Sequence, residues 1–439
     1  MSIVKSQKSL HGVHVPHHKN TEDKQSVFFQ DAKEIRIPMQ QHMGAPCKPL
    51  VKAGDSVKVG QKIGDSEEFF SVPIHASCSG TVKKVEDFLT VNGAKTKAVV
   101  IENDGAYTWD EQVKKPDVTD KKSFLEAVRE SGLVGLGGAG FPAHVKLAYQ
   151  DPDRITKLVI NGAECEPYIT ADFRECMENT ENVLDGIRAV CQYLEIQDVY
   201  LGIESNKPEA IRLFDEKTAN DPHFHVVELK QMYPQGAEKS IIYATTGIVV
   251  KAGKLPADCG VLVMNVSSVG FLGGYLKDGK PLVSKRITVD GDAIEHPDNL
   301  IVPIGTPIQD VLDHCGVSDS VKKVLMGGPM MGIAVSDMSS PVIKNNNAIL
   351  AFSYNEIREE KTTACIRCGS CVSACPMNLM PAALEKAYDR QDGDALMNLR
   401  IDLCINCGCC SYVCPANRQL AQKNQLAKVF ARNHGKKKV

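Results

Sequence analysis

The sequence lacks several features that would assign it to common classes of protein. It has one tryptophan, Trp109, aromatic residues make up 6% of its 439 positions, and its formal net charge is −3. A chain so close to neutrality is not expected to have nucleic acid as its main partner. It contains no run of about 18 uninterrupted apolar residues, so no transmembrane span is predicted. The most apolar stretch, residues 261–274, is broken by Asn265, two serines and several glycines.

No signal peptide is predicted either, because the first twenty residues are polar and rich in histidine and lack the apolar core that a signal peptide needs. Without export the thiols are expected to stay reduced, and clustered cysteines then indicate metal ligands rather than disulfides. The histidines of this stretch, in an extended segment with a proline, favour a packing arm over a metal site. Hydrophobic residues at 43% and charged residues at 24% are typical of a globular chain of several domains.

Cysteine is abundant, with sixteen residues, and eight of these repeat one pattern. Each copy reads C-x2-C-x2-C-x3-C-P, the spacing of bacterial ferredoxins that hold two [4Fe–4S] clusters. Three cysteines of one copy bind one cluster, and the fourth binds the other. The spacing therefore predicts a first cluster held by Cys365, Cys368, Cys371 and Cys414, and a second held by Cys404, Cys407, Cys410 and Cys375.

Alternative interpretations of these cysteines are weaker. Zinc ribbons have paired C-x2-C knuckles without the C-x3-C-P extension. Cys409 lies inside the second motif but out of phase with it, so it is interpreted as a bystander. The remaining scattered cysteines are expected to be buried as small hydrophobic residues.

The texture of the sequence changes along the chain and predicts a multidomain α/β protein with small β domains. Short strands between glycine turns, including 69–74, indicate a small all-β sandwich or barrel. Strands that alternate with helices follow, and they indicate an open sheet covered by helices; two of these helices are expected at 123–130, capped by Ser123, and at 177–194. A β-rich insert and a helical cysteine-containing section follow. The expected units are an N-terminal arm (1–30), a β barrel-sandwich (31–103), an α/β domain (120–280), a β-grasp insert (281–340), a ferredoxin-like module (355–430) and a basic tail (431–439).

A glycine-rich loop lies in the α/β section, where Gly135, Gly137, Gly138 and Gly140 match G-x-G-x-x-G. A dinucleotide-binding Rossmann motif requires a strand before this loop, whereas here a helix precedes it, so that interpretation is disfavoured. The sequence predicts instead a loop whose amides cradle a phosphate or a flavin ring, with Lys146 as a nearby cation. Glu164 and Glu166 follow a predicted buried strand, where open sheets bind ligands.

Four sequence segments resemble the flavin-site motifs of the NADH-oxidising flavoprotein subunit of respiratory complex I. The four are Gly132-Leu-Val-Gly-Leu-Gly-Gly-Ala-Gly-Phe-Pro142, Asn161-Gly-Ala-Glu164-Cys-Glu166-Pro167, Tyr233-Pro-Gln-Gly236-Ala-Glu238 and Asn265-Val-Ser-Ser268. The resemblance implies an FMN and NAD(H) site. Its implied contacts are Gly135, Gly137, Gly138, Gly140, Phe141, Lys146, Asn161, Glu164, Glu166, Glu238, Asn265 and Ser268, with Glu164 and Glu166 as the catalytic carboxyls.

Over nearly its whole length the chain resembles the RnfC family of the Rnf complex, an ion-translocating ferredoxin:NAD⁺ oxidoreductase of bacterial membranes. The order of barrel-sandwich, flavin domain, β-grasp insert and dicluster module is the same. The resemblance implies a peripheral subunit on the cytoplasmic face of the cell membrane that exchanges hydride between NAD(H) and FMN and single electrons between FMN and two [4Fe–4S] clusters. Its implied partners are the other membrane and iron–sulfur subunits and, indirectly, ferredoxin.

Two alternatives stay open at this point. One is a soluble dehydrogenase or cobalamin reductase with similar parts. The other is an electron-carrier scaffold that has lost nucleotide binding, since Leu136, Ala163 and Ala237 stand where the complex I flavoprotein has arginine, aspartate and glutamate.

Overall fold

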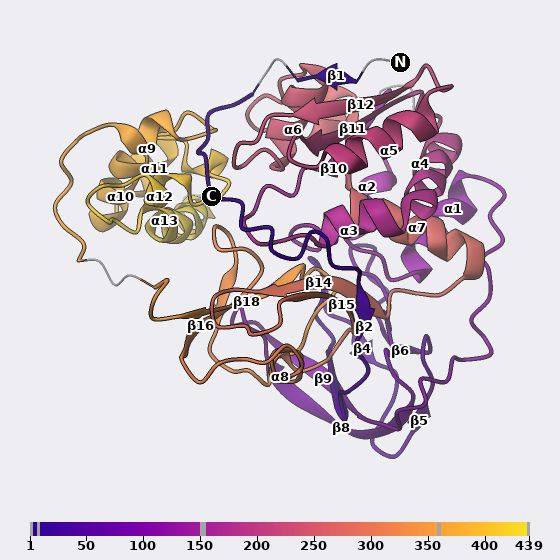
Figure 1. The fold of residues 1–439 in the computed structure, drawn as a ribbon. Helices are drawn as coiled ribbons and strands as arrows, with labels where there is room; N and C mark the ends of the chain where they lie inside the picture. The colour runs from indigo at the N-terminus through magenta and orange to yellow at the C-terminus, as the bar shows by residue number, and fades with distance from the viewer. Residues whose placement is uncertain (1–2, 7–8, 150–154, 358–360, 437–439) are drawn as a thin grey trace.

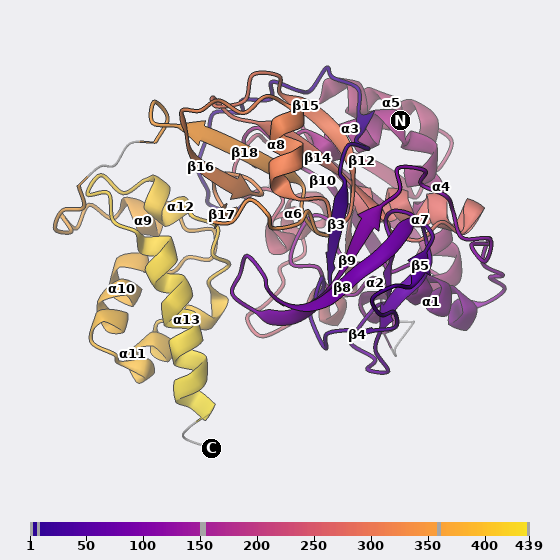
Figure 2. The ribbon, with the colours of Figure 1, turned by 90° about the horizontal axis from the view of Figure 1, so that it is seen from below.

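The computed structural model describes residues 3–6, 9–149, 155–357 and 361–436. Within these ranges the chain forms an α/β body, β sheets that lie beneath it in Figure 1, and a separate helical module on one side (Figures 1 and 2). Lys437 and Lys438 of the predicted basic tail lie outside the described residues. The mixed α/β fold class with small β domains is confirmed, while the domain boundaries stay predictions.

The α/β body is built on a parallel sheet. Its described strands follow the order β1 (Val4–Lys5), β12 (Phe224–Leu229), β11 (Asp198–Glu204), β10 (Lys157–Gly162) and β13 (Val261–Asn265). The inner strands are rich in buried aliphatic residues, as expected for a parallel sheet covered on both faces, and β10 carries the continuous buried run of residues 158–160. The helices of this body are α1 (Lys121–Glu130), α2 (Ala143–Leu147), α3 (Ala171–Glu178), α4 (Thr180–Leu194), α5 (Pro208–Thr218), α6 (Glu238–Thr246) and α7 (Val266–Asp278).

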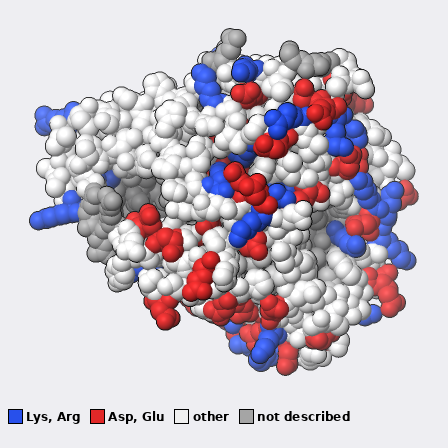
Figure 3. Space-filling view, in the orientation of Figure 1, with Lys and Arg blue, Asp and Glu red and all other residues white. Residues whose placement is uncertain are grey.

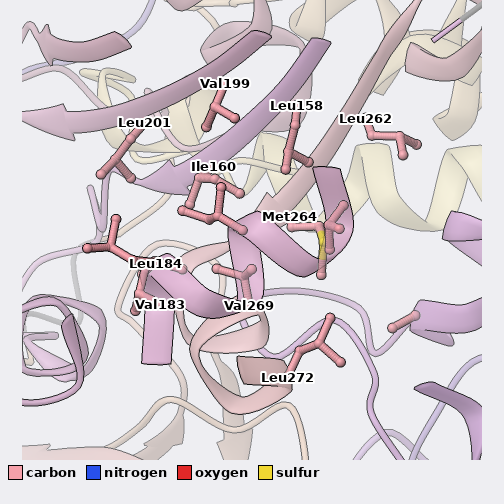
Figure 4. Packing of buried hydrophobic residues seen from close by; sticks show 14 of the residues in the cluster. Leu158, Ile160, Val183, Leu184, Val199, Leu201, Leu262, Met264, Val269 and Leu272 are labelled. Atoms are coloured by element: carbon pink, nitrogen blue, oxygen red, sulfur yellow. The ribbon is translucent and has the colours of Figure 1, made fainter. Parts of the chain in front are cut away.

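Aliphatic side chains of the sheet form the core of this body together with helices α4 and α7 (Figure 4). Leu158 and Ile160 from β10 point toward Val183 and Val269 on those helices. The two helices approach closely because both carry glycine at the contact: a Cβ at Gly186 would lie 2.0 Å from the carbonyl oxygen of Val269.

Two predicted helices differ in detail from the structure. Helix α1 is capped by Asp120 rather than Ser123, which lies at the third helical position and completes a reciprocal capping box with it. The expected helix over 177–194 is two helices, because the chain breaks at Asn179 between α3 and α4. Both errors concern helix ends, which local patterns locate poorly.

The β segments form three sheets in the described residues. The first has the order β17 (Ile333–Val335), β16 (Val321–Met326), β18 (Ala348–Ser353), β14 (Ser284–Asp290), β15 (Asp298–Pro303) and β2 (Val27–Phe28), with helix α8 (Ile308–His314) beside it. The second has β3 (Glu34–Pro38), β9 (Lys95–Asn103), β8 (Gly80–Leu89) and β5 (Ser56–Val57). The third has β4 (Lys48–Pro49), β6 (Lys62–Asp65) and β7 (Ile74–His75), so the strand predicted over 69–74 is wrong except at its end.

The helical module contains α9 (Ser370–Ser373), α10 (Pro381–Asp389), α11 (Gly393–Asn398), α12 (Cys409–Tyr412) and α13 (Leu420–Lys436). It projects from the rest of the molecule in both ribbon views (Figures 1 and 2). No helix among the described residues combines the length and the apolar character needed to cross a membrane.

The N-terminal arm (residues 3–6 and 9–30 as described) connects these parts. Strand β1 extends the parallel sheet beside β12, and β2 extends the six-stranded sheet beside β15. Between them, Val13 pairs with Tyr233 through two backbone hydrogen bonds of 2.8 and 2.9 Å. His11 lies 2.8 Å from the carbonyl oxygen of Ser373 in the helical module. These contacts make the arm a packing element between the α/β body, the six-stranded sheet and the helical module.

Candidate functional site

The motifs predicted to bind a flavin meet at the carboxyl ends of strands β10 and β13. Asn265 ends β13, and its register partner Asn161 lies one residue before the end of β10. Asn265 also caps helix α7, since its Oδ1 accepts a hydrogen bond from the Ser268 amide at 3.2 Å. The side-chain Nδ2 of Asn161 donates to the carbonyl oxygen of Gly236 at 2.8 Å, and this bond brings the third motif to the same edge of the sheet. Open α/β sheets bind ligands at this edge.

The glycine loop lies on this edge with its backbone uncovered. A Cβ at Gly137 would lie 2.5 Å from Asn265 Nδ2, whereas one at Gly138 would have no atom within 4 Å. Residues 137–139 are exposed. The loop is fixed from beneath, because the Leu136 amide donates to Ser268 Oγ at 2.9 Å. A flat ring or a phosphate can therefore approach the amides directly, without a side chain intervening.

The glycine loop is held by a bond within itself and by contacts from the neighbouring β segments. The Gly135 amide donates to the Phe141 carbonyl oxygen at 2.9 Å, closing the loop on itself. The Gly140 carbonyl accepts from the Met43 amide at 3.0 Å, and Asn345 Nδ2 donates to the Gly138 carbonyl at 2.8 Å. The Phe141 ring packs edge-on against Phe70, with centroids 5.0 Å apart. The barrel-sandwich segment thus supports the loop.

Lys146 is anchored beside the loop and is partly exposed. Its Nζ donates to Glu238 Oε2 at 2.9 Å and to the carbonyl oxygen of Val263 at 2.8 Å. The first contact is an ion pair that joins the first and third motifs. The ammonium group therefore stays at the sheet edge, where an anionic group on the glycine loop would meet it.

Glu164 and Glu166, the predicted catalytic carboxyls, are partly buried in one tight turn. Glu164 has a left-handed backbone, with φ of 48°, and its carboxylate accepts from the amides of Asp172 and Phe173 at the start of α3. Glu166 accepts from the Met330 amide at 3.0 Å. Burial raises the pKa of both carboxyls, that of Glu166 to about 7. A group that titrates near neutral pH is suited to proton exchange.

Three charged residues at this turn were missed by the sequence prediction. Lys19, from the arm, donates from Nζ to the carbonyl oxygens of Glu164 (3.0 Å), Glu166 (2.9 Å) and Ile169 (2.5 Å). Lys207 is buried and donates to the carbonyl oxygen of Ala163 at 2.8 Å. Asp172 accepts from Asn265 Nδ2 at 2.7 Å and from Ser267 Oγ at 2.5 Å, and so joins the turn to α7. Burial lowers the pKa of Lys19, and the Glu164 carboxylate opposes that shift.

The raised pKa of Glu166 predicts a pH-dependent stability difference between the wild type and Glu166→Gln. Its folded-state pKa of about 7 lies above the ordinary 4.5, so the folded protein holds this proton more tightly than the unfolded chain does. That stabilisation is present below pH 4.5 and is lost as pH rises to about 7. We expect the free energy of unfolding of the wild type to fall relative to the variant across this window, measured by denaturant titration at equal cofactor content. Glu126→Gln, at an exposed carboxylate of α1, is the control; a flat wild-type-minus-variant difference for Glu166→Gln would contradict the prediction.

The eight motif cysteines fall into the two predicted quartets. Cys365, Cys368, Cys371 and Cys414 line one cavity, and Cys375, Cys404, Cys407 and Cys410 line another, to which Cys409 also contributes. Each quartet lines a cavity, and nowhere in the described residues are three His, Cys, Asp or Glu side chains placed for a single ion. This arrangement fits a polynuclear cluster better than zinc, although the ligand assignment itself stays a prediction.

Backbone geometry around the quartets also fits a cluster. Gly369 and Gly408 have φ of 82° and 83°, a conformation that favours glycine and turns each ligand loop. The Leu379 amide donates to the sulfur of Cys375 at 3.4 Å. Cys409 differs from its neighbours, because its Sγ lies 3.8 Å from the carbonyl oxygen of Tyr233, so its thiol is directed to the flavin-type domain.

The second quartet adjoins the α/β body directly. The Tyr233 hydroxyl donates to the carbonyl oxygen of Cys407 at 2.7 Å, and Tyr233 is one of the most buried large side chains. One apolar cluster joins the two parts and contains Val13, Tyr233, Cys407 and Cys409. Cys165, which lies between Glu164 and Glu166, packs against this cluster. The predicted flavin edge and the predicted cluster are therefore joined by packed protein.

Comparisons with known proteins agree with this geometry. Residues 128–272 match the Nuo51 FMN-binding domain, 364–418 a 4Fe-4S dicluster domain, and 7–106 the RnfC barrel sandwich hybrid domain. Fold and site thus define an iron–sulfur flavoprotein, and the predicted FMN and [4Fe–4S] cofactor classes are confirmed. The chain is 41% identical to a subunit of the proton-translocating ferredoxin:NAD(+) oxidoreductase complex of Clostridium ljungdahlii, over 80% of this chain and 78% of that protein. It belongs to the RnfC family.

Two further similarities are consistent with this assignment. The corresponding subunit of the Na(+)-translocating ferredoxin:NAD(+) oxidoreductase complex of Acetobacterium woodii is 39% identical, over 87% of this chain and 88% of that protein. Among solved structures, the NAD+-reducing [NiFe]-hydrogenase in the air-oxidized state matches with a TM-score of 0.50 and 16% identity, covering 71% of this chain and 61% of that chain. The latter likeness concerns the fold alone.

Proposed function

We propose that this chain is a peripheral electron-transfer subunit of an ion-translocating ferredoxin:NAD⁺ oxidoreductase. The observation that carries the proposal is the contact between its two sites: Tyr233, from a flavin-type motif, donates its hydroxyl hydrogen bond to Cys407 of a cysteine quartet. Exchange of electrons between NAD(H) and single-electron carriers requires a site that handles two electrons, here the flavin site, next to a site that handles one electron, here the cysteine quartet. The names of its relatives give the same reaction.

The flavin-site residues have separable tasks in this proposal. Bound FMN would exchange a hydride with the nicotinamide and single electrons with the clusters. The amides of Gly137 and Gly138 would meet its ring or phosphate, Lys146 would offset phosphate charge, and Asn161 and Asn265 would orient polar ring atoms. Glu164 and Glu166, held in their turn by Lys19, would bind and orient the substrate side and hold or release a proton.

The partners follow from the relatives' membership of multisubunit complexes. We assign this chain other membrane and iron–sulfur subunits as partners, ferredoxin as an indirect one, and a position on the cytoplasmic face of the bacterial cell membrane. Ion translocation belongs to those other subunits. Membrane association that depends on co-expressed partner subunits is the expected outcome of cell fractionation, whereas a soluble dehydrogenase or a cobalamin reductase would stay in the supernatant in either case.

The decisive experiment is an anaerobic titration of the purified chain, loaded with iron, sulfide and FMN, with NADH. We expect bleaching of the flavin absorbance, followed by loss of the iron–sulfur absorbance as electrons reach the clusters. Retained flavin absorbance would eliminate the dehydrogenase function and favour the scaffold alternative that Leu136, Ala163 and Ala237 suggest. Photoreduction without NADH is the control that shows that the clusters are reducible.

A further inference from the structure

A short segment between strands β17 and β18 grips the glycine-loop segment at its start and in its middle. Lys344 is buried, and its Nζ donates to the carbonyl oxygens of Gly132 at 2.7 Å and Pro73 at 2.9 Å. The next residue, Asn345, donates from Nδ2 to the carbonyl oxygen of Gly138 at 2.8 Å. Two neighbouring side chains of this segment therefore hold two carbonyl groups of the predicted flavin loop.

The segment is itself fixed on the barrel-sandwich strands. The Lys344 amide donates to Gln41 Oε1 at 3.2 Å, and Gln41 Nε2 donates to the carbonyl oxygen of Pro38 at 3.2 Å. The Lys344 side chain fills the space beside Gly132, where a Cβ would lie 2.9 Å from Nζ. Because the backbone next to it is anchored in this way, Asn345 acts on the loop from a fixed position.

The Asn345 bond determines which way one peptide unit of the loop faces. In a planar trans peptide the carbonyl group and the following N–H group point in opposite directions. The Gly138 carbonyl is turned toward Asn345, so the N–H of Ala139 points away from Asn345. Ala139 is exposed, and its amide can therefore be reached by a ligand.

A second peptide unit of the loop is held from the same flank. The Met43 amide donates to the Gly140 carbonyl oxygen at 3.0 Å. A Cβ at Gly140 would lie 3.6 Å from Asn345 Cγ, so both donors approach the loop from one side. The N–H groups of Ala139 and Phe141 are both directed to the opposite side, and backbone N–H groups arranged in this way form concavities that bind phosphate.

Recognition of a phosphate by this chain depends on such local donors. On the face shown in Figure 3, the Lys and Arg side chains of the described residues are interspersed with Asp and Glu, and no broad basic surface gathers there. Beside the glycine loop the cation is Lys146, whose Nζ is also engaged by Glu238 at 2.9 Å. The amides of the loop must therefore supply part of the binding of an anionic group.

We propose that Asn345 is a positioning residue that aims the Ala139 amide at a phosphate group of FMN or of NAD(H). The inference rests on the proposed function, because it takes the glycine loop to bind one of these ligands. Gly138 has no side chain to restrict its backbone, so without the Asn345 bond the peptide unit can rotate and the amide loses its fixed direction. A donor that is already ordered binds an anion more tightly than one that must be ordered on binding.

The test uses the full chain with both clusters loaded and the flavin removed. Asn345→Ala removes the donor, Asn345→Asp keeps the size of the side chain but replaces the donor by a carboxylate, and Asn345→Gln keeps the amide. The matched control is Asn103→Ala, because Asn103 Nδ2 likewise donates to a backbone carbonyl, that of Ala32 at 2.7 Å, at the end of β9.

Each ligand is compared with a counterpart that lacks phosphate. Fluorescence titration gives the affinities for FMN and for riboflavin. The proteins are then saturated with FMN, and steady-state kinetics give the Michaelis constants for NADH and for reduced nicotinamide riboside. Iron content and thermal unfolding are measured on every variant, so that a loss of fold or of clusters is recognised.

We expect Asn345→Ala and Asn345→Asp to bind one of the phosphate-bearing ligands roughly tenfold more weakly, and its phosphate-free counterpart less than about twofold more weakly. A loss for FMN but not for riboflavin assigns the phosphate to FMN. A raised Michaelis constant for NADH but not for reduced nicotinamide riboside assigns it to NAD(H). Asn345→Gln should recover part of the loss, and Asn103→Ala should change neither comparison.

Two results would overturn the positioning role. One is an equal loss with and without the phosphate, since a merely structural role would weaken both ligands of a pair together. The other is a loss in Asn345→Ala no larger than that in Asn103→Ala. Absence of flavin bleaching by NADH in the wild type would instead overturn the proposed function, because the affinities for FMN and riboflavin are measured without NADH.

Discussion

Replacing Cys407 by Ser should remove one cluster, about half of the roughly eight irons expected per chain, and leave the Cys365 quartet loaded. Cys375→Ser should do the same, although Cys375 belongs by sequence to the first motif, because its side chain lines the cavity of the second quartet. A hydroxyl is a poor substitute for a thiolate ligand to iron. Iron and acid-labile sulfide per chain give the loss.

Spectroscopy identifies which cluster is lost. Electron paramagnetic resonance of the reduced Cys375→Ser and Cys407→Ser proteins should show the same single, magnetically isolated centre, and Cys414→Ser and Cys368→Ser should share a different one. Cys409→Ser is the matched control: Cys409 neighbours a ligand but its thiol faces Tyr233, so full iron content is expected. If Cys375→Ser matched Cys371→Ser rather than Cys407→Ser, the crossed assignment would be wrong.

Replacing Lys19 by Met should weaken FMN binding by about tenfold or more and should also lower stability. The ammonium group satisfies three carbonyl oxygens of the Glu164–Ile169 turn, and each buried oxygen left without a donor costs about 1–3 kcal/mol. Glu164 and Tyr168 in this turn have left-handed backbones, a strained conformation for residues other than glycine that persists only where the surroundings hold it. The turn should therefore shift when Lys19 is removed.

Fluorescence titration of the deflavinated protein with FMN measures the first effect, and thermal unfolding the second. Lys24→Met is the matched control, because Lys24 lies in the same arm and donates to a single carbonyl, that of Pro297, at an exposed position. Lys19→Arg should retain part of the affinity. Equal FMN affinity in Lys19→Met and Lys24→Met would show that the turn does not depend on this ammonium group.

Local patterns predicted much of this fold from the sequence. The alternation of strands with helices predicted an open sheet covered by helices, and strands β10 to β13 alternate with helices α3 to α6 in this way. The cysteine quartets could be paired because the motif carries its own geometry, including the crossing of Cys375. The four motifs that resemble the complex I flavoprotein were identified by their amino-acid sequences, and the structure brings them together at one edge of the sheet.

Contacts between distant segments could not be predicted in the same way. Lys19 is 145 residues from Glu164 along the chain, and no local pattern in the arm predicts which carbonyl oxygens this lysine contacts. Asp172 was missed for another reason: it lies in the first turn of α3, a helix that the sequence pattern placed too late. A carboxylate at a helix start beside a buried strand was the signal available. The support of the glycine loop by Met43 and Asn345 likewise depends on tertiary packing.

The arm also has a consequence for biosynthesis. Its contacts span 238 residues between Ser6 and Ala244 and 362 between His11 and Ser373. A ribosome releases the arm long before these partners exist, so each part of the arm stays unpaired until its partner segment has been synthesised, and the part around His11 waits for the helical module. Closing such long loops costs little more than closing shorter ones, since the entropy grows only with the logarithm of length. The arm is therefore expected to dock late, as a clasp that locks parts already folded.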